Sequence, residues 1–313
     1  MYKRSVVLVI GIVVIISLVA AAFVTPRLKQ RGMAGEKPKI AIIYVEGVII
    51  GGRGQNTLLS EYGGTDNLIK QLHEARDDSS VKAVILRINS PGGSAPASQE
   101  VGEEIKKLRS GGKPVVTSMG DVAASGGYWL AACSDRIYAN PATLTGSIGV
   151  YMPYANWEEL YKKIGIRQEK IKSGPHKDIL SPDRQMTGEE RALIQLMVDD
   201  MYNQFVTVVA EGRKMDPVRV RQLADGRIYT GNQAKELGLV DELGNLYDAV
   251  DGTAAMAGIQ GKPEIKEYGK VSPLQVLLGT SDKMELLDKL LFKQLKNDAP
   301  ITAPLAMPEK WGE

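Results

Sequence analysis

Three short apolar runs constrain the fold of this 313-residue chain more than any other feature. They cover residues 39–47, 81–88 and 115–119 and consist mostly of Val, Ile, Leu and Ala. Runs this short and this continuously apolar are typical of strands buried on both faces of a parallel sheet. Segments with helical spacing, 68–75 and 98–108, lie between them. This alternation predicts an α/β fold with a parallel sheet layered against helices and right-handed crossovers.

Further elements are predicted along the rest of the chain. Thr65 or Asp66 is placed to cap the first helix, and Thr187 and Glu190 form a capping-box pattern at the start of a long helix. The other expected elements are a helix from 128, a short strand in 135–140, the long helix 189–213, a turn and strand in 223–231, a helix 233–237 stopped by Gly238, and helices 274–278 and 284–295. The final residues, 298–313, are rich in proline and are expected to be irregular.

The N-terminal apolar run, residues 6–24, has the length of a membrane span. Its 19 residues extend about 28 Å as a helix, close to the roughly 30 Å hydrocarbon core of a bilayer. We expect an uncleaved signal anchor, although Ala20–Ala22 also fits a cleavage site. More lysines and arginines follow the run than precede it, and this count favours a cytoplasmic location for the large domain after it. In contrast, the two charged residues before the run resemble the start of an export signal.

Composition excludes several function classes. The net charge of +2 gives no bulk attraction to nucleic acid, so no nucleic-acid partner is expected. The single Cys133 rules out an intramolecular disulfide and is expected to be a small core residue. Two histidines, His73 and His176, leave little material for a zinc site. No metal and no cofactor are predicted.

Ser125 is the first candidate for chemistry. It lies between small residues in Ala123-Ala124-Ser125-Gly126-Gly127, where an apolar strand is expected to turn into a helix. Nothing bulky covers its hydroxyl, and the next backbone N–H groups belong to a helix N-terminus, as a nucleophile beside an oxyanion donor requires. The alternative is a tight turn whose serine only caps the helix.

Two other glycine turns add candidates. Asn89-Ser90-Pro91-Gly92-Gly93 follows a predicted strand, and its backbone N–H groups could complete an oxyanion hole with that of Gly126. Ser147, in Thr145-Gly146-Ser147-Ile148-Gly149-Val150, offers a second small hydroxyl. Both stretches could equally be plain turns that use glycine for its dihedral angles.

A nucleophilic serine needs a base. His73 fits a solvent-facing helical position, while His176 lies between Lys172 and Lys177. A neutral lysine can act as a base if burial lowers its pKa by roughly three units, at a cost of about 4 kcal/mol. From the residues alone, each lysine could also be an ordinary surface charge.

Taken together, these stretches resemble the signal peptide peptidase A family of serine proteases, family S49. The matching pieces are residues 89–94, 123–128, 145–150, 172–178 with Met186-Thr187, and 226–231 through 238–241. They occur in the family's order across 40–254. The resemblance implies an anchor and linker at 1–38, a protease domain at 39–254 and a C-terminal extension at 255–313. It also implies a fold similar to the Clp and crotonase superfamily, built of repeated β-β-α units.

The resemblance further implies roles for the candidates. Ser125 is expected to be the nucleophile, Lys177 rather than Lys172 the general base, and Ser147 the hydroxyl that orients the lysine. Gly126 with Gly92 or Gly93 is expected to form the oxyanion hole. Short family members are similar to ring or dome homo-oligomers in which the lysine of one protomer meets the serine of its neighbour. The implied substrates are apolar peptides such as signal peptide remnants, cleaved by a single-pass membrane protein with its domain outside the cytoplasm.

Three alternatives remain at this stage. A crotonase-like acyl-CoA enzyme would share the fold but would need neither Ser125 nor Lys177 nor an anchor. A non-catalytic, membrane-anchored scaffold that binds peptides would need none of the candidates to meet. A Ser-His-Asp protease would use His176 in place of the lysine.

Overall fold

The computed structural model describes residues 37–53, 55–57, 60–62 and 64–268. The chain divides into two compact units, Met1–Tyr268 and Gly269–Glu313, and all described residues belong to the first. The predicted anchor (6–24) and the predicted helices 274–278 and 284–295 lie outside the described residues.

In the part of the chain that is described, no helix combines the length and the apolar character needed to cross a membrane.

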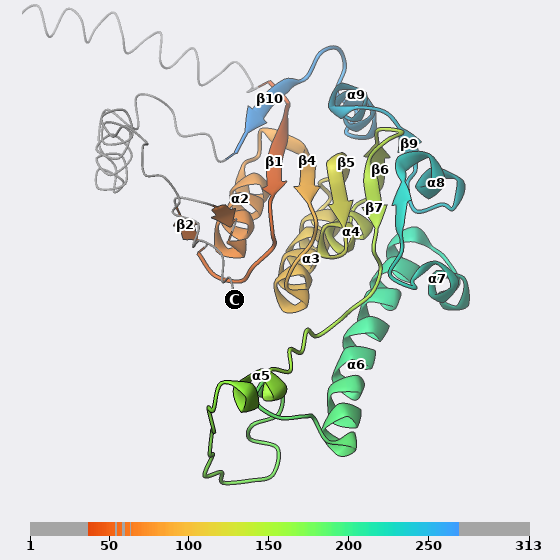
Figure 1. The fold of residues 1–313 in the computed structure, drawn as a ribbon. Helices are drawn as coiled ribbons and strands as arrows, with labels where there is room; N and C mark the ends of the chain where they lie inside the picture. Colours follow the sequence, from red (N-terminus) through yellow and green to blue (C-terminus); the bar gives the residue numbers. More distant parts are fainter. Residues whose placement is uncertain (1–36, 54, 58–59, 63, 269–313) are drawn as a thin grey trace, which may run out of the picture. The chain divides into compact units, whose positions relative to one another are not determined.

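A parallel sheet forms the centre of the fold, as the apolar runs predict (Figure 1). Its strands occur in the order β10-β1-β4-β5-β6-β9, and every neighbouring pair along this path is parallel. The strands are β1 (Lys39–Glu46), β4 (Val81–Ser90), β5 (Val115–Ala124), β6 (Arg136–Ala139), β9 (Glu242–Leu243) and β10 (Glu264–Glu267). Beside the end of β5, β7 (Leu144–Gly146) pairs in parallel with β5 and antiparallel with β8 (Ile228–Thr230). A separate hairpin pairs β2 (Gln55–Thr57) with β3 (Ser60–Tyr62).

The sheet is buried on both faces, which explains why its strands lack polar alternation. Ala41, Ile43 and Val45 of β1 belong to the main core with helices α2 (Thr65–Asp77), α3 (Ala95–Ser110) and α4 (Gly126–Ala132). Ile40 and Ile42 of the same strand belong to a second core that includes Ala249 and Ala254 of α9 (Leu246–Met256). Helices therefore cover both sides of the strands that carry the candidate turns.

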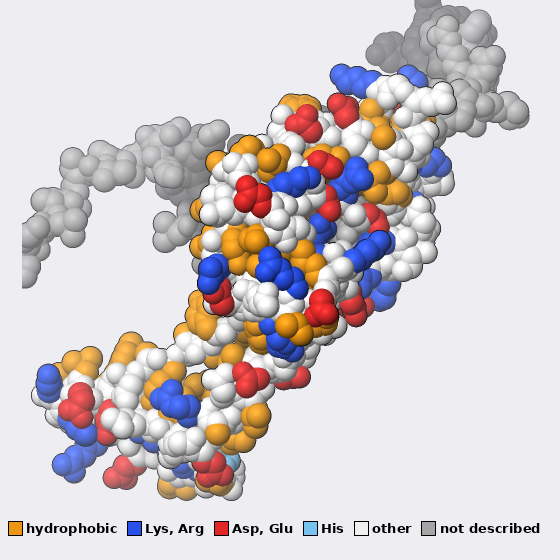
Figure 2. All heavy atoms as spheres, turned by 90° about the vertical axis from the view of Figure 1, so that its right-hand side faces the viewer, with side chains coloured by type: hydrophobic (Ala, Val, Ile, Leu, Met, Phe, Trp, Pro, Cys, Tyr) orange, Lys and Arg blue, Asp and Glu red, His pale blue; other side chains and the backbone are white. Residues whose placement is uncertain are grey.

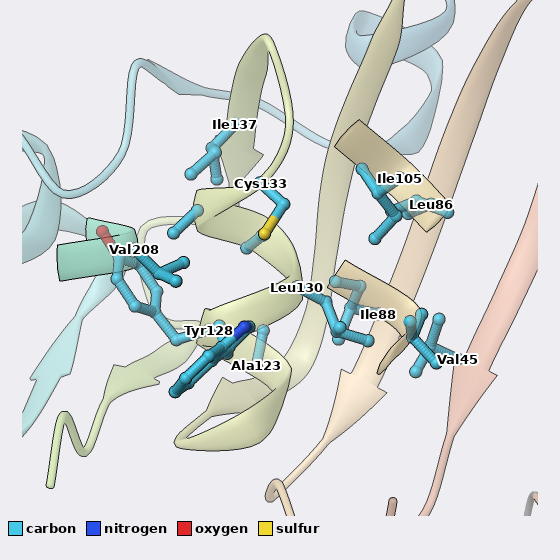
Figure 3. Packing of buried hydrophobic residues seen from close by; sticks show 14 of the residues in the cluster. Val45, Leu86, Ile88, Ile105, Ala123, Tyr128, Leu130, Cys133, Ile137 and Val208 are labelled. Atoms are coloured by element: carbon cyan, nitrogen blue, oxygen red, sulfur yellow. The ribbon is translucent and has the colours of Figure 1, made fainter. Parts of the chain in front are cut away.

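Helix α4 is the central element of the main core, since all its residues are buried. Figure 3 shows Tyr128, Leu130 and Cys133 packed among side chains from the neighbouring strands and helices. The Tyr128 hydroxyl donates to the carbonyl oxygen of Leu239 at 2.8 Å. The Trp129 ring packs against that of Phe205 of α6 (Gly188–Arg213), tilted by 36°, with the ring centroids 4.9 Å apart. The helix that begins at the candidate nucleophile is thus fixed on several sides.

Residues 151–187 form an arm between β7 and α6. The arm contains the short helix α5 (Glu158–Lys163) and extends away from the sheet together with the first half of α6 (Figure 1). After α6, the chain returns through α7 (Pro217–Leu223) and α8 (Gly231–Glu236) to the sheet edge.

Several details differ from the sequence-based expectations. Helix α2 begins after Gly64, with no side-chain cap, so neither Thr65 nor Asp66 is its N-cap. Strand β5 continues five residues beyond the predicted 115–119, up to Ser125. Leu196 and Met197 follow the apolar spacing of α6, yet they are 66% and 54% exposed because this half of the helix lies away from the core. The capping box of Thr187 and Glu190 is confirmed.

A partly buried ion pair joins the end of α6 to the residue before β9, and its loss is expected to destabilise the fold. The Arg213 guanidinium, 6% exposed, donates to both Asp241 carboxylate oxygens at 2.5 and 2.9 Å and to Gly238 O at 3.1 Å. Arg213→Ala removes these hydrogen bonds and leaves the 31% exposed Asp241 without its counter-charge, so it should lower the free energy of unfolding by roughly 2 kcal/mol. Urea denaturation measures this, with the exposed Arg219→Ala as control, which should stay within about 0.5 kcal/mol of wild type. Equal midpoints for both variants would contradict the prediction.

Candidate active site

Ser125 occupies the turn between β5 and α4 in a strained conformation. Its φ is 52° and its ψ is −120°, a region that non-glycine residues rarely adopt. The backbone N–H donates to Gly146 O at 2.9 Å, and its carbonyl accepts from Trp129 N at 2.9 Å. The half-buried side chain makes no capping hydrogen bond, so Ser125 is not the plain capping serine of the alternative interpretation. The hydroxyl stays available for chemistry.

The Gly92–Gly93 turn lies directly against Ser125. A Cβ atom on Gly92 would lie 2.6 Å from Gly126 N and 2.7 Å from Ser125 Cβ, so only glycine permits this approach. A Cβ on Gly126 would in turn lie 3.3 Å from Gly93 N. The backbone nitrogens of Gly93 and Gly126 therefore lie close together beside the serine, near the position where an oxyanion hole would be needed.

The two candidate glycines of this turn are not equivalent. The Gly92 N–H donates to Ser90 Oγ at 3.1 Å, and the turn is held to Ile49 by bonds from Ile49 N to Gly92 O (2.9 Å) and from Ser94 N to Ile49 O (2.8 Å). No such bond involves the Gly93 N–H in the described part of the chain. The geometry thus favours Gly93 over Gly92 as the second oxyanion donor, with Gly92 needed for the close approach.

Ser147 lies on the neighbouring strand end. Ala124 pairs with Gly146, so Ser125 and Ser147 each follow one member of that pair. Ser147 also has a positive φ, 50°, and its N–H donates to Arg227 O at 2.8 Å. The structure therefore brings Ser147 to the same edge of the sheet as Ser125.

A pocket of about 310 Å³ opens beside the serine. Ser125, Gly126 and Gly93 line one part of it. Most of the remaining wall consists of apolar side chains, namely Pro96, Trp129, Val150, Tyr151, Met152, Met201 and Phe205. Sequence reasoning missed these wall residues, because Met201 and Phe205 come from α6, far along the chain, and nothing local marks them. The pocket suits an apolar side chain placed next to a nucleophile.

Lys177 is not part of this arrangement within one chain. It is exposed on the arm, in a turn where its backbone N–H donates to Gly174 O at 3.3 Å. It does not line the pocket of Ser125. The structure thus brings Ser125, Gly126, the Gly92–Gly93 turn and Ser147 together and leaves Lys177 apart from them.

The neighbouring candidates for a base differ from Lys177 in their contacts. Lys172 Nζ donates to Asp178 Oδ1 at 2.7 Å and to Pro175 O at 3.2 Å, so its amine already has a structural role. His176 Nε2 lies 3.5 Å from Glu189 Oε1 of α6, and His73 Nε2 of α2 lies 2.7 Å from Glu104 Oε2 of α3. Among the described lysines of the 170–177 stretch, only Lys177 has a side chain with no hydrogen bond or ion pair.

Cys133 is the core residue that its apolar surroundings predict. Its side chain is free and buried, and burial raises the pKa of the thiol to about 12. A thiol that does not ionise near neutral pH is a poor nucleophile. Cys133 therefore does not compete with Ser125 as a reactive group.

Comparison with known proteins assigns the chain to a family. The model of peptidase family S49 matches residues 107–260. The chain is 43% identical to a proposed signal peptide peptidase SppA of Enterococcus faecium over 68% of this chain and 62% of that protein. It is 40% identical to a proposed protease of Synechocystis over 81% of this chain and 88% of that protein. It is also 40% identical to Protease 4 of Salmonella typhi, over 71% of this chain and 35% of that protein. This chain belongs to peptidase family S49.

Proposed function

We propose that this chain is a membrane-anchored serine endopeptidase that cleaves apolar peptides, such as signal peptide remnants, with Ser125 as nucleophile and Lys177 as base. The observation that carries the proposal is the strained turn at Ser125. It presents a hydroxyl beside the Gly93 and Gly126 amides at an apolar pocket. Membership of peptidase family S49 supports the same chemistry.

The proposed reaction has two steps. Ser125 Oγ attacks the peptide carbonyl carbon while Lys177 Nζ takes its proton, and the carbonyl oxygen becomes negative beside the two amides. The lysine then gives the proton to the leaving amine as the C–N bond breaks. In the second step, water attacks the acyl-serine ester, passes its proton to the lysine and releases the acid while Ser125 regains its hydrogen. Ser147 is proposed to orient the amine through its hydroxyl.

The position of Lys177 favours a dyad shared between neighbouring protomers. The lysine lies on the arm, away from the pocket of its own chain, and must lose solvent before it can act as a base. The arm also carries a set of exposed apolar side chains, namely Tyr151, Trp157, Leu160, Ile164, Ile166 and Ile171. Figure 2 shows apolar side chains lying among charged ones on one face of the molecule. Contact with a second copy would cover these side chains and bury the lysine at the same time.

The pocket supports the proposed substrate class, and the anchor expected from the sequence supports the proposed location. An apolar pocket beside the nucleophile suits peptides with apolar or small side chains. A relative that is named a signal peptide peptidase supports signal peptide remnants as the substrate class. With residues 6–24 as a single membrane span, the catalytic unit is proposed to work next to the cell membrane, on its extracytoplasmic side.

Covalent labelling tests the proposed activity. The full chain in detergent, treated with a serine-directed fluorophosphonate, should gain one adduct on Ser125, which peptide mass spectrometry locates. Its rate of hydrolysis of an apolar peptide ester should fall in proportion to the fraction of labelled chains. Ser98, also a pocket residue, is the internal control and should stay unlabelled because its hydroxyl already donates to Ser94 O at 2.9 Å. An unlabelled Ser125 together with no hydrolysis would favour the scaffold or the acyl-CoA alternative. Hydrolysis that survives Lys177→Ala but not His176→Ala would favour the histidine relay.

A further inference from the structure

The turn that carries Lys177 is held by charged side chains rather than by a core. Residues 170–184 are all exposed or half-buried, so apolar packing does little to fix them. A base must nevertheless be placed accurately, because displacement by about 1 Å can cost roughly 100-fold in rate. Something other than a core therefore has to define the position of this turn.

Arg184 lies at the centre of the charged cluster. Its guanidinium donates from Nε to Asp178 Oδ2 at 2.9 Å and from Nη2 to Asp178 Oδ1 at 2.7 Å. The same group donates from Nη1 to Glu190 Oε2 at 2.8 Å and from Nη2 to Glu190 Oε1 at 2.6 Å. Arg184 thus binds two carboxylates at once, each in a bidentate manner, which the planar fork of arginine allows and lysine does not.

The two carboxylates connect the lysine turn to a rigid element. Asp178 is the residue next to Lys177 in the chain, and its side chain is 10% exposed. Glu190, 3% exposed, is the last member of the capping box that begins α6, and its Oε2 accepts from Thr187 N at 2.9 Å. Arg184 and Lys172 hold the pKa of the Asp178 carboxyl well below its usual range, and Arg184 lowers that of Glu190 to about 2. Both carboxylates are therefore charged throughout the neutral range.

We propose that Arg184 is a positioning residue for the reaction. It fixes the Lys177 turn to the start of α6 through Asp178 and Glu190. The inference rests on the proposed role of Lys177 as base and goes beyond it, because it names what holds that base in place. Arg184 does not touch the substrate or the reacting atoms in this scheme.

The positioning role also predicts the behaviour of the partner carboxylate. Asp178→Asn removes the charge from one of the two carboxylates that Arg184 binds. It should lower kcat with little change in KM, because the Lys177 turn is held less firmly while the nucleophile and the pocket stay intact.

The test measures kcat and KM for the full chain in detergent with an apolar peptide ester. Arg184→Gln and Arg184→Lys should each lower kcat about 30- to 100-fold with KM changed less than about threefold, because the nucleophile and the pocket stay intact. The double variant with Asp178→Asn should lose little more than Arg184→Gln alone, since both act through one contact. Arg191 is an exposed arginine in the first turn of α6, so Arg191→Gln is the matched control and should behave as wild type.

The possible outcomes separate this inference from the proposed function. Wild-type kcat in Arg184→Gln, with Lys177→Ala inactive, overturns the positioning role and leaves the dyad intact. Full activity in Lys177→Ala overturns the dyad itself. If Arg184→Gln fails to assemble, Asp178→Asn decides: a lower kcat with KM nearly unchanged supports the proposal, and wild-type kcat refutes it.

Discussion

An equimolar co-expression of Ser125→Ala and Lys177→Ala chains is expected to yield a hydrolase, although each variant alone is inactive. Separately, each change should lower kcat by at least about 10⁴-fold, because it removes the nucleophile or its base. In a mixed assembly, a complete site forms wherever a chain that keeps Ser125 meets the arm of a chain that keeps Lys177. Random mixing around a ring with head-to-tail contacts makes roughly a quarter of the sites complete.

The physical reason lies in where the two side chains are. Ser125 lines the pocket at the end of the sheet, whereas Lys177 lies exposed on the arm and does not reach that pocket in its own chain. The measurement is the rate of hydrolysis of an apolar peptide ester per chain, for protein that carries a different affinity tag on each variant and has been purified through both. Activity near a quarter of wild type supports a site made from two chains.

The control for this experiment keeps the assembly and removes the possibility of a complete site. Ser125→Ala co-expressed with the double variant Ser125→Ala/Lys177→Ala contains no nucleophile and should stay inactive. An inactive mixture of the two single variants, with assembly intact, would show that serine and lysine act within one chain or that Lys177 is not the base. Retained activity in Lys177→Ala alone would point to another base.

The sequence predicts the centre of this molecule well, because its signals there are local. The runs in β1, β4 and β5 are apolar on both sides since helices cover both faces of the sheet, and the pattern shows this directly. Ser125 is marked by the small residues that flank it, since only they leave room for a sharp turn against Gly92. These features depend on neighbours in the chain and can be found without the fold.

Features that depend on distant contacts could not be predicted in the same way. β10 carries the sequence Glu-Ile-Lys-Glu and has no apolar run, yet it pairs with β1 across more than 200 residues of chain. Leu196 and Met197 have the spacing of a buried helix face but lie outside the core, because α6 extends beyond it. The pocket wall combines Trp129 with Phe205 of α6, and only the folded chain brings them together. The ion cluster around Arg184 has no sequence signature beyond its individual charges.

Replacing Gly92 with alanine is expected to abolish most of the activity while the fold is retained. Gly92 has a φ of +100°, where an L-residue is strained, and its Cβ would lie within 2.6 to 2.9 Å of Gly126 N, Ser125 Cβ and Ala124 O. Two of these are backbone atoms, so relief requires the turn to move away from the nucleophile. That movement separates the Gly93 and Gly126 amides, and loss of an oxyanion donor typically costs about 10² to 10³ in kcat.

The matched control separates the clash from the backbone strain. Gly112, in the exposed turn before β5, has a φ of +85°, and a Cβ there would meet nothing within 4 Å. Gly112→Ala should therefore lose about 1 kcal/mol of stability and keep wild-type kcat. Gly92→Ala should lose somewhat more stability, about 2 kcal/mol, together with its activity. Steady-state kinetics and urea denaturation of both variants measure these effects. The added methyl group can affect the reaction only by displacing the Gly93 and Gly126 amides. Wild-type kcat in Gly92→Ala would therefore mean that the close approach of this turn to Ser125 is not needed for catalysis.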